Sequence, residues 1–168
     1  MKNNIVLIGM PGVGKSTIGV ILAKILGYKF VDADLLIQER EGRLLKDIIA
    51  SEGTDGFIRI EEEVNASIEA ENTIIATGGS VVYGKKAMEH LKDIGTVVYL
   101  KVSFETLEKR LADIKGRGVV LREGQNLWDL FEERSPLYEE YADIELSEDN
   151  LQIEQTVEKL VAKITNNN

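Results

Sequence analysis

The sequence predicts an α/β fold with a doubly wound parallel sheet, and three observations indicate it. Short apolar runs rich in β-branched residues alternate with longer segments of helical period. A glycine-rich segment at residues 9–16 joins the first apolar run to the first helical segment. The chain has 168 residues and no internal repeat or proline-rich linker, which fits a single domain over residues 1–168. Because strands separated by helices pair in parallel through right-handed crossovers, helices are expected on both faces of the sheet.

The predicted strands are short apolar runs. Residues 5–8 are too few for the core of a signal peptide and are followed directly by glycines, so they are expected to be the first strand. Further runs predict strands at 29–31, 74–76, 96–102 and 144–146. None approaches the roughly twenty residues of a membrane span. We therefore expect a cytoplasmic protein that has no membrane partner.

The predicted helices separate these strands. Helical period predicts them at 15–26, 35–49, 56–71, 85–93, 104–111, 127–141 and 153–164. Core positions are expected for Trp128, Phe131, Tyr138 and Tyr141, because each pair has helical spacing. His90 is expected to have a solvated or packing role. Lys109 and Arg110 are expected on a helix surface, and the acidic run at 61–63 on a solvated helix face.

The composition excludes several classes of function. The chain has no cysteine, so disulfide frameworks, thiolate nucleophiles and cysteine-rich zinc sites are excluded. Its 29 acidic and 20 basic side chains give a net charge of −9. Because affinity for nucleic-acid backbones comes from clustered Lys and Arg, we expect no nucleic-acid partner. A monomer is expected.

Residues 9–16 match the phosphate-loop pattern G-x-x-x-x-G-K-[ST], after a predicted strand and at the start of a predicted helix. Glycines let the N–H groups of such a loop converge on phosphate oxygens. Lys15 is placed to reach the β- and γ-phosphates, and the Ser16 hydroxyl is placed to bind Mg²⁺. A glycine turn without a ligand would not require Lys-Ser at its end. We therefore expect the chain to bind a nucleoside triphosphate with Mg²⁺.

Asp32 and Asp34 follow the second predicted strand, at the sheet edge where doubly wound folds bind ligands. Because they are two residues apart, their side chains share one side if the strand conformation continues. One carboxylate can then hold Mg²⁺ through water, and the other can take the proton of an acceptor hydroxyl. The structural alternative is that Asp34 caps the N-terminus of the following helix.

The triphosphate is expected to serve a small phosphotransferase. The chain is too short for a large nucleotide-driven machine, and it contains no Asn-Lys-x-Asp segment that would read guanine. A phosphotransferase needs a metal-holding acid, a base, cations for the phosphoryl group and a lid against water. Residues 113–125 carry glycines and basic residues between two helical segments, which predicts a surface loop that can move as a lid.

Five segments, in their order and spacing, resemble the shikimate kinase family over nearly the whole chain. They are GMPGVGKSTIG from residue 9, FVDADLLIQEREG from 30, ATGGSV from 76, the Arg117 loop and ERSPLYEEYAD from 133. The resemblance implies that the γ-phosphate of ATP is moved to a hydroxyl of shikimate, a step in aromatic amino acid biosynthesis. It also implies a P-loop fold of the nucleoside-monophosphate-kinase type with strand order 2-3-1-4-5. Within it, a segment near 33–62 binds the substrate and a segment near 113–125 forms the lid.

By position, the resemblance implies a role for each matching residue. The ATP-binding residues are Gly12, Val13, Gly14, Lys15, Ser16, Thr17 and Arg117. The substrate-binding residues are Asp34, Gly78, Gly79 and Arg134. Mg²⁺ is held by Ser16 and, through water, by Asp32. The catalytic residues are Lys15, Asp34 and Arg117; Asp34 deprotonates the acceptor, and Arg134 binds the substrate carboxylate. Glu61 matches a family glutamate that orients a nearby arginine.

Three positions depart from the family pattern. A second arginine that binds the substrate carboxylate falls at Ile58, and Arg59 lies about 100° around the helix from it, so Arg59 is a substrate-binding candidate only after a local shift. Ser80 stands in place of a third glycine, and Gly118 in place of a lid proline. A kinase for another small hydroxy acid, polyol or nucleotide therefore stays open. So does a catalytically weak ATP-binding regulatory module.

Overall fold

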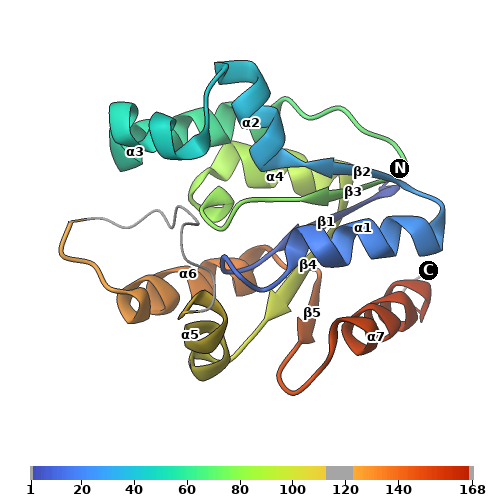
Figure 1. Cartoon of the computed structure of the whole chain (residues 1–168). Helices are drawn as coiled ribbons and strands as arrows, with labels where there is room; N and C mark the ends of the chain where they lie inside the picture. The colour runs from blue at the N-terminus through green and yellow to red at the C-terminus, as the bar shows by residue number, and fades with distance from the viewer. Residues whose placement is uncertain (1, 113–122, 167–168) are drawn as a thin grey trace.

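The computed structural model describes residues 2–112 and 123–166. They contain one five-stranded parallel sheet of order β2-β3-β1-β4-β5, flanked by helices (Figure 1). The strands are β1 (Asn4–Ile8), β2 (Lys29–Asp32), β3 (Thr73–Ala76), β4 (Gly95–Lys101) and β5 (Ile144–Ser147). The helices are α1 (Lys15–Leu26), α2 (Ala33–Glu41), α3 (Leu45–Ala66), the short 3₁₀ helix η1 (Val81–Tyr83), α4 (Lys85–Ile94), α5 (Phe104–Ala112), α6 (Leu127–Tyr141) and α7 (Ile153–Asn166). The predicted doubly wound fold and its strand order are confirmed.

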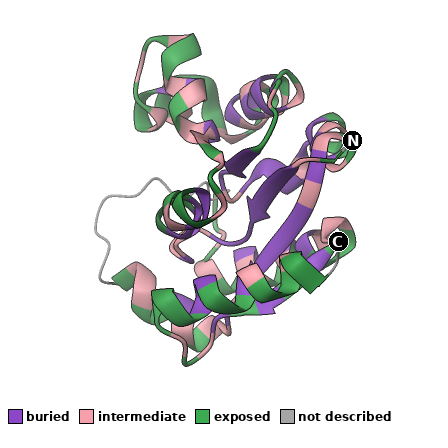
Figure 2. Cartoon of the chain, turned by 90° about the vertical axis from the view of Figure 1, so that its right-hand side faces the viewer, coloured by how far each residue is buried: buried purple, intermediate pink, exposed green. Residues whose placement is uncertain are grey.

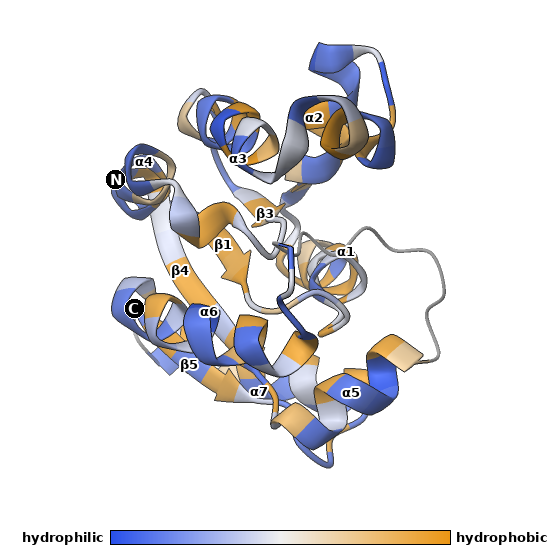
Figure 3. Ribbon diagram, turned by 90° about the vertical axis from the view of Figure 1, so that its left-hand side faces the viewer, coloured by the Kyte–Doolittle hydropathy of each residue, from blue (hydrophilic) through white to orange (hydrophobic). Residues whose placement is uncertain are grey.

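β1 lies at the centre of the sheet, between β3 and β4, and all five of its residues are buried. Burial on both faces explains why residues 5–8 are uniformly aliphatic instead of alternating with polar residues. α1 packs against β3 and α7, whereas α4 and α6 pack against β4. Figure 2 shows buried residues along the strands, and Figure 3 shows hydrophobic residues on the same strands. No helix within 2–112 and 123–166 is long and apolar enough to span a bilayer.

The carboxyl ends of the strands meet at one edge of the sheet. Ala76, the last residue of β3, pairs with both Leu7 of β1 and Asp32 of β2. The segments that follow these three strands therefore begin side by side. They are the glycine-rich loop at 9–14, the first turn of α2 and the segment 77–80. This register places the candidate site at the edge where doubly wound folds bind ligands.

The helices between β2 and β3 differ from the prediction. α2 already ends at Glu41, because Gly42 adopts a left-handed conformation with φ 66°. α3 begins at Leu45 and continues through the predicted gap between 49 and 56, where Gly53 (φ 74°, ψ 177°) forms a kink. It ends at Ala66 and not at 71. Just after this end, the hydroxyl and the backbone N–H of Ser67 both donate to the Val64 carbonyl. These capping bonds compete with continuation of the helix.

The predicted burial of Trp128 is wrong. Trp128 lies in the first turn of α6, which extends away from the sheet (Figure 1), and it is 44% exposed. It packs instead on Phe104 and Phe131, with ring centroids 4.8 and 5.9 Å away. Only part of the apolar face of α6 packs on the core. The spacing of Trp128 and Phe131 identifies that face but not where along the helix it leaves the core. The predicted burial of Tyr138, farther along α6, is confirmed.

Candidate active site

The loop between β1 and α1 has the backbone geometry of an anion site. Gly14, the residue before α1, adopts φ 89°, a left-handed conformation that favours glycine. Within the described part of the chain, no side chain caps this helix end. The first N–H groups of α1 therefore remain available to an anion, and the helix dipole adds partial positive charge.

Lys15 lies inside this loop. Its side chain is buried, and Nζ donates to the carbonyl oxygens of Gly9 at 2.7 Å and Met10 at 2.9 Å. The lysine therefore folds back over the loop that precedes it. This conformation places a positive charge beside the N–H groups at the start of α1.

Ser16, Asp32 and Asp34 are connected by hydrogen bonds. Asp32 Oδ2 accepts from the Ser16 hydroxyl at 2.8 Å, and Asp32 Oδ1 accepts from the Asp34 N–H at 2.9 Å. The second bond makes Asp32, not Asp34, the N-cap of α2, so the capping alternative for Asp34 is wrong. The reason is that α2 starts one residue earlier than expected from the sequence, at Ala33. Asp34 therefore lies in the first helical turn, with its side chain lining the cavity.

The segment after β3 shows why two glycines are required there. A Cβ on Gly78 would lie only 2.7 Å from Glu61 Oε2 and 2.8 Å from Asp34 Oδ1. A Cβ on Gly79 would lie 2.9 Å from Arg134 Nη1. Two carboxyl groups and one guanidinium thus converge on a backbone that has no side chain of its own. Any side chain at either glycine would force these groups away.

Arg134 is a buried cation on α6, only 1% exposed. Its Nε donates to the Tyr83 hydroxyl at 3.3 Å, and its guanidinium carbon lies 5.3 Å from the centre of the Tyr83 ring. The Tyr83 hydroxyl in turn donates to Glu133 Oε1 at 2.5 Å. The Tyr138 hydroxyl donates to the Gly79 carbonyl at 2.5 Å and holds that backbone against α6. These contacts fix the guanidinium at the cavity wall, where a rigid planar donor suits a carboxylate or phosphate.

Glu61 is the functional candidate that the sequence placed wrongly. It was expected on a solvated helix face, but it is 2% exposed, and Oε1 accepts from the Ser80 hydroxyl at 2.5 Å. Burial raises the pKa of Glu61 to about 7; the Ser80 hydrogen bond opposes this rise and the negative charge of Asp34 adds to it. The positive charges of Arg134 and Lys15 also oppose it. Its spacing from Phe57 and Val64, both buried, is the signal that could have placed it inside.

We expect Glu61→Gln to change the pH dependence of stability. Because the pKa of Glu61 is about 7 in the folded protein and 4.5 ordinarily, the folded state binds this proton more tightly than the unfolded state. Wild-type stability therefore falls as the pH rises from 4.5 through 7, by up to about 3 kcal/mol from this group. The glutamine variant lacks that loss. Its free energy of unfolding relative to wild type, measured in urea, should therefore be higher at pH 8 than at pH 5.

Exposed Glu69→Gln is the matched control, and it should show no such difference. Equal stability differences between wild type and Glu61→Gln at both pH values would contradict a raised pKa. Glu148, whose pKa is also raised to about 7 by burial, is present in every variant, so its contribution cancels.

One cavity brings most of the predicted site residues together. Its lining includes Gly12, Gly14, Lys15, Ser16, Thr17, Asp32, Asp34, Gly78, Gly79 and Arg134, together with Pro11, Leu45, Ile49, Phe57, Glu61, Thr77 and Ser80. Val13 is a buried residue of the glycine-rich loop, and Arg59 is exposed on α3; neither lines the cavity. Ile58 is half-buried and does not line it either. Arg117, with the lid residues 113–122, lies outside the described residues.

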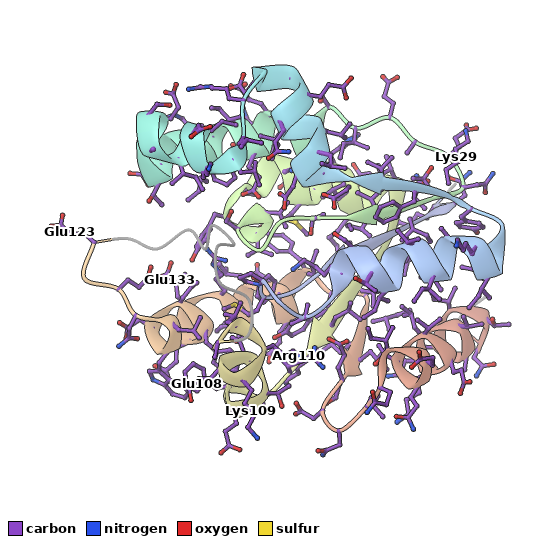
Figure 4. All side chains as sticks on the ribbon, in the orientation of Figure 1. Lys29, Glu108, Lys109, Arg110, Glu123 and Glu133 are labelled. Carbon is purple, nitrogen blue, oxygen red and sulfur yellow. The ribbon has the colours of Figure 1, made fainter. Side chains whose placement is uncertain are left out.

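Arg110 is a second residue whose environment the sequence did not predict. It was expected on a helix surface, but it points from α5 toward the loop after β5 (Figure 4). Nη1 donates to the Val13 carbonyl at 3.3 Å and lies 3.6 Å from Glu148 Oε2. Arg110 therefore stabilises the glycine-rich loop through the Val13 carbonyl. Both contacts join residues far apart in the sequence, so local pattern carries no signal for them.

Comparison with known proteins points to one family. A model of the shikimate kinase family matches residues 11–165. The chain is 38% identical to a shikimate kinase of Sulfurihydrogenibium sp. over 162 residues, covering 96% of this chain and 97% of that protein. It is also 38% identical to one of Haemophilus influenzae over 172 residues, with 99% and 95% covered. The solved structure of a shikimate kinase from Acinetobacter baumannii in complex with shikimate is 32% identical, covers 99% of this chain and 95% of that one, and has a TM-score of 0.88.

Proposed function

The chain belongs to the shikimate kinase family, and we propose that its cavity transfers the γ-phosphate of ATP to a hydroxyl of shikimate, giving shikimate 3-phosphate. The observation that carries the proposal is that the Asp34 carboxylate lies in one cavity with both the phosphate loop and the buried Arg134 guanidinium. Such a cavity can hold a triphosphate and an acidic alcohol side by side. The phosphoryl group is then transferred between two molecules held in one complex, and not between two molecules that must meet in water.

ATP is expected to bind with its phosphates at the start of α1. The N–H groups of Gly12, Val13 and Gly14, and of the three residues that follow, would surround the phosphate oxygens. The Lys15 ammonium would stabilise negative charge on the β- and γ-phosphates. Arg117, outside the described residues, is proposed from the resemblance to contact the same phosphates.

The residues beside the phosphate loop fit Mg²⁺. The Ser16 hydroxyl and the Asp32 carboxylate lie 2.8 Å apart, and Mg²⁺ prefers such oxygen donors. Ser16 would hold the ion directly and Asp32 through water. When bound, Mg²⁺ supplies positive charge to the phosphate oxygens. Within 2–112 and 123–166, no group of three or more His, Asp or Glu side chains could hold a metal alone, so the phosphates themselves would complete the site.

Asp34 is proposed as the general base. Its carboxylate takes the proton of the acceptor hydroxyl as that oxygen forms a bond to the γ-phosphorus, and the bond between that phosphorus and the β–γ bridging oxygen breaks to release ADP. Arg134 would bind the shikimate carboxylate, and the backbone at Gly78 and Gly79 would approach the ring closely. Among the described arginines, Arg134 is the only one that lines the cavity.

The proposal also covers the organisation of the enzyme. We propose one kinase domain over residues 1–168, with an acceptor-binding segment at 33–62 and a lid at 113–125. We propose that it acts as a monomer in the cytoplasm, where ATP is available.

The test is an acceptor screen with purified protein, in which ADP release is coupled to a dehydrogenase. Shikimate should stimulate ADP release strongly, whereas gluconate and thymidine monophosphate should not. Turnover with gluconate or the nucleotide but not with shikimate would overturn the assigned acceptor. Calorimetric binding of ATP without turnover of any acceptor would favour the regulatory-module alternative.

A further inference from the structure

Ser80 and Glu61 form a buried pair in the acceptor half of the cavity. Ser80 stands where the family pattern has a third glycine, and it is 3% exposed. Its hydroxyl donates to Glu61 Oε1 at 2.5 Å. A serine at this position therefore makes a side-chain contact that glycine cannot make.

Glu61 lines the cavity, and its other oxygen lies close to Gly78 and Asp34. Glu61 Oε2 and Asp34 Oδ1 lie 2.7 and 2.8 Å from the same point above Gly78, so they are no farther apart than the sum of those distances. Within the described part of the chain, the Ser80 hydroxyl donates to Oε1 and not to Oε2. Oε2 is thus an acceptor atom of a buried side chain, beside the proposed base, that a bound molecule can use.

Ile58 stands where the family pattern has an arginine that could bind Glu61. It lies three residues before Glu61 on α3, where side chains are neighbours on one helix face. An arginine there would donate to Glu61, but isoleucine has no donor. The two departures from the family pattern therefore act on the same carboxyl: the loss at position 58 leaves Glu61 without an arginine, and Ser80 supplies a hydroxyl.

We propose that Glu61 binds the acceptor hydroxyl adjacent to the one that is phosphorylated, and that Ser80 is the positioning residue that holds Glu61 for this contact. This inference rests on the proposed kinase function. The adjacent oxygens of Asp34 and Glu61 match the two oxygens of a vicinal diol, with one hydroxyl donating to each. In shikimate, the 4-hydroxyl is the only neighbour of the 3-hydroxyl, because ring carbon 2 carries none. The acceptor class is therefore a vicinal diol acid.

The test compares shikimate with 4-deoxyshikimate in wild type, Ser80→Gly and Glu61→Ala. At pH 8, where Glu61 is ionised, wild type should prefer shikimate by about 10- to 100-fold in kcat/KM, the value of one hydrogen bond to a charged group. Glu61→Ala should abolish this preference, and Ser80→Gly should reduce it by about tenfold, both by slowing shikimate and not the analogue. Because each preference is a ratio from one preparation, it does not depend on the fraction of folded enzyme.

Ser67→Gly makes the same chemical change at an exposed position and should keep the wild-type preference. A wild-type enzyme that uses both acceptors equally would overturn the role of Glu61 while leaving the kinase function intact. Loss of preference in Glu61→Ala but not in Ser80→Gly would overturn the role of Ser80. No turnover of shikimate by wild type would instead count against the proposed function itself.

Discussion

Asp34→Asn is expected to lower kcat by about 10²- to 10⁴-fold, the usual contribution of a general base. Asparagine keeps the size and one acceptor oxygen of aspartate, but its amide cannot take the proton of the acceptor hydroxyl. The fold should survive the change, because Asp32 and not Asp34 caps α2. KM for shikimate should change much less than kcat, because the amide can still accept a hydrogen bond.

Steady-state kinetics and thermal unfolding together measure this effect. Asp47→Asn, the same change at an exposed residue in the first turn of α3, is the matched control and should retain wild-type kcat. A folded Asp34→Asn enzyme with wild-type kcat would exclude Asp34 as the base. A loss of kcat accompanied by a clearly lowered melting temperature would show a structural role instead.

Much of the fold could be predicted because its signals are local. The aliphatic run of β1, the glycines after it and the Lys-Ser pair all lie within twelve consecutive residues, and together they define strand, loop and helix. Helix ends were less predictable. Gly42 stops α2 and Gly53 only kinks α3, although both have a positive φ. The sequence around each glycine does not distinguish these two outcomes.

The phosphate half of the site was predictable for the same reason, whereas the acceptor half depends on tertiary contacts. Asp34, Glu61 and Arg134 come from three different helices and meet only because those helices surround the backbone at Gly78 and Gly79. The acidic run at 61–63 has the charge of a solvated face, yet its first member points inward. The Ser80 hydroxyl that donates to Glu61 lies in the segment between β3 and η1. Such a pair becomes visible only when the chain is folded.

Lys15→Met is expected to lower kcat/KM for ATP by about 10²- to 10³-fold or more, a loss typical of removing one preorganised donor to a developing charge. Methionine keeps the unbranched stem and removes the ammonium, so the loss should reflect the missing charge. Kinetics at varied ATP measures the loss in kcat/KM, and calorimetric titration measures the loss in ATP affinity. Lys24→Met, an exposed lysine on the same helix, should leave both unchanged.

Lys15 has a second role that the same variant can separate. Its ammonium bonds the Gly9 and Met10 carbonyls, so losing it also releases the start of the phosphate loop. If that release dominated, Lys15→Arg, which can still donate to both carbonyls, would restore activity fully. If charge at the phosphates dominates, as we expect, arginine should restore stability but only part of the activity, because its planar fork cannot act as a compact point charge. A Lys15→Met enzyme with wild-type kcat/KM would remove Lys15 from the mechanism, since neither role would then be needed for transfer.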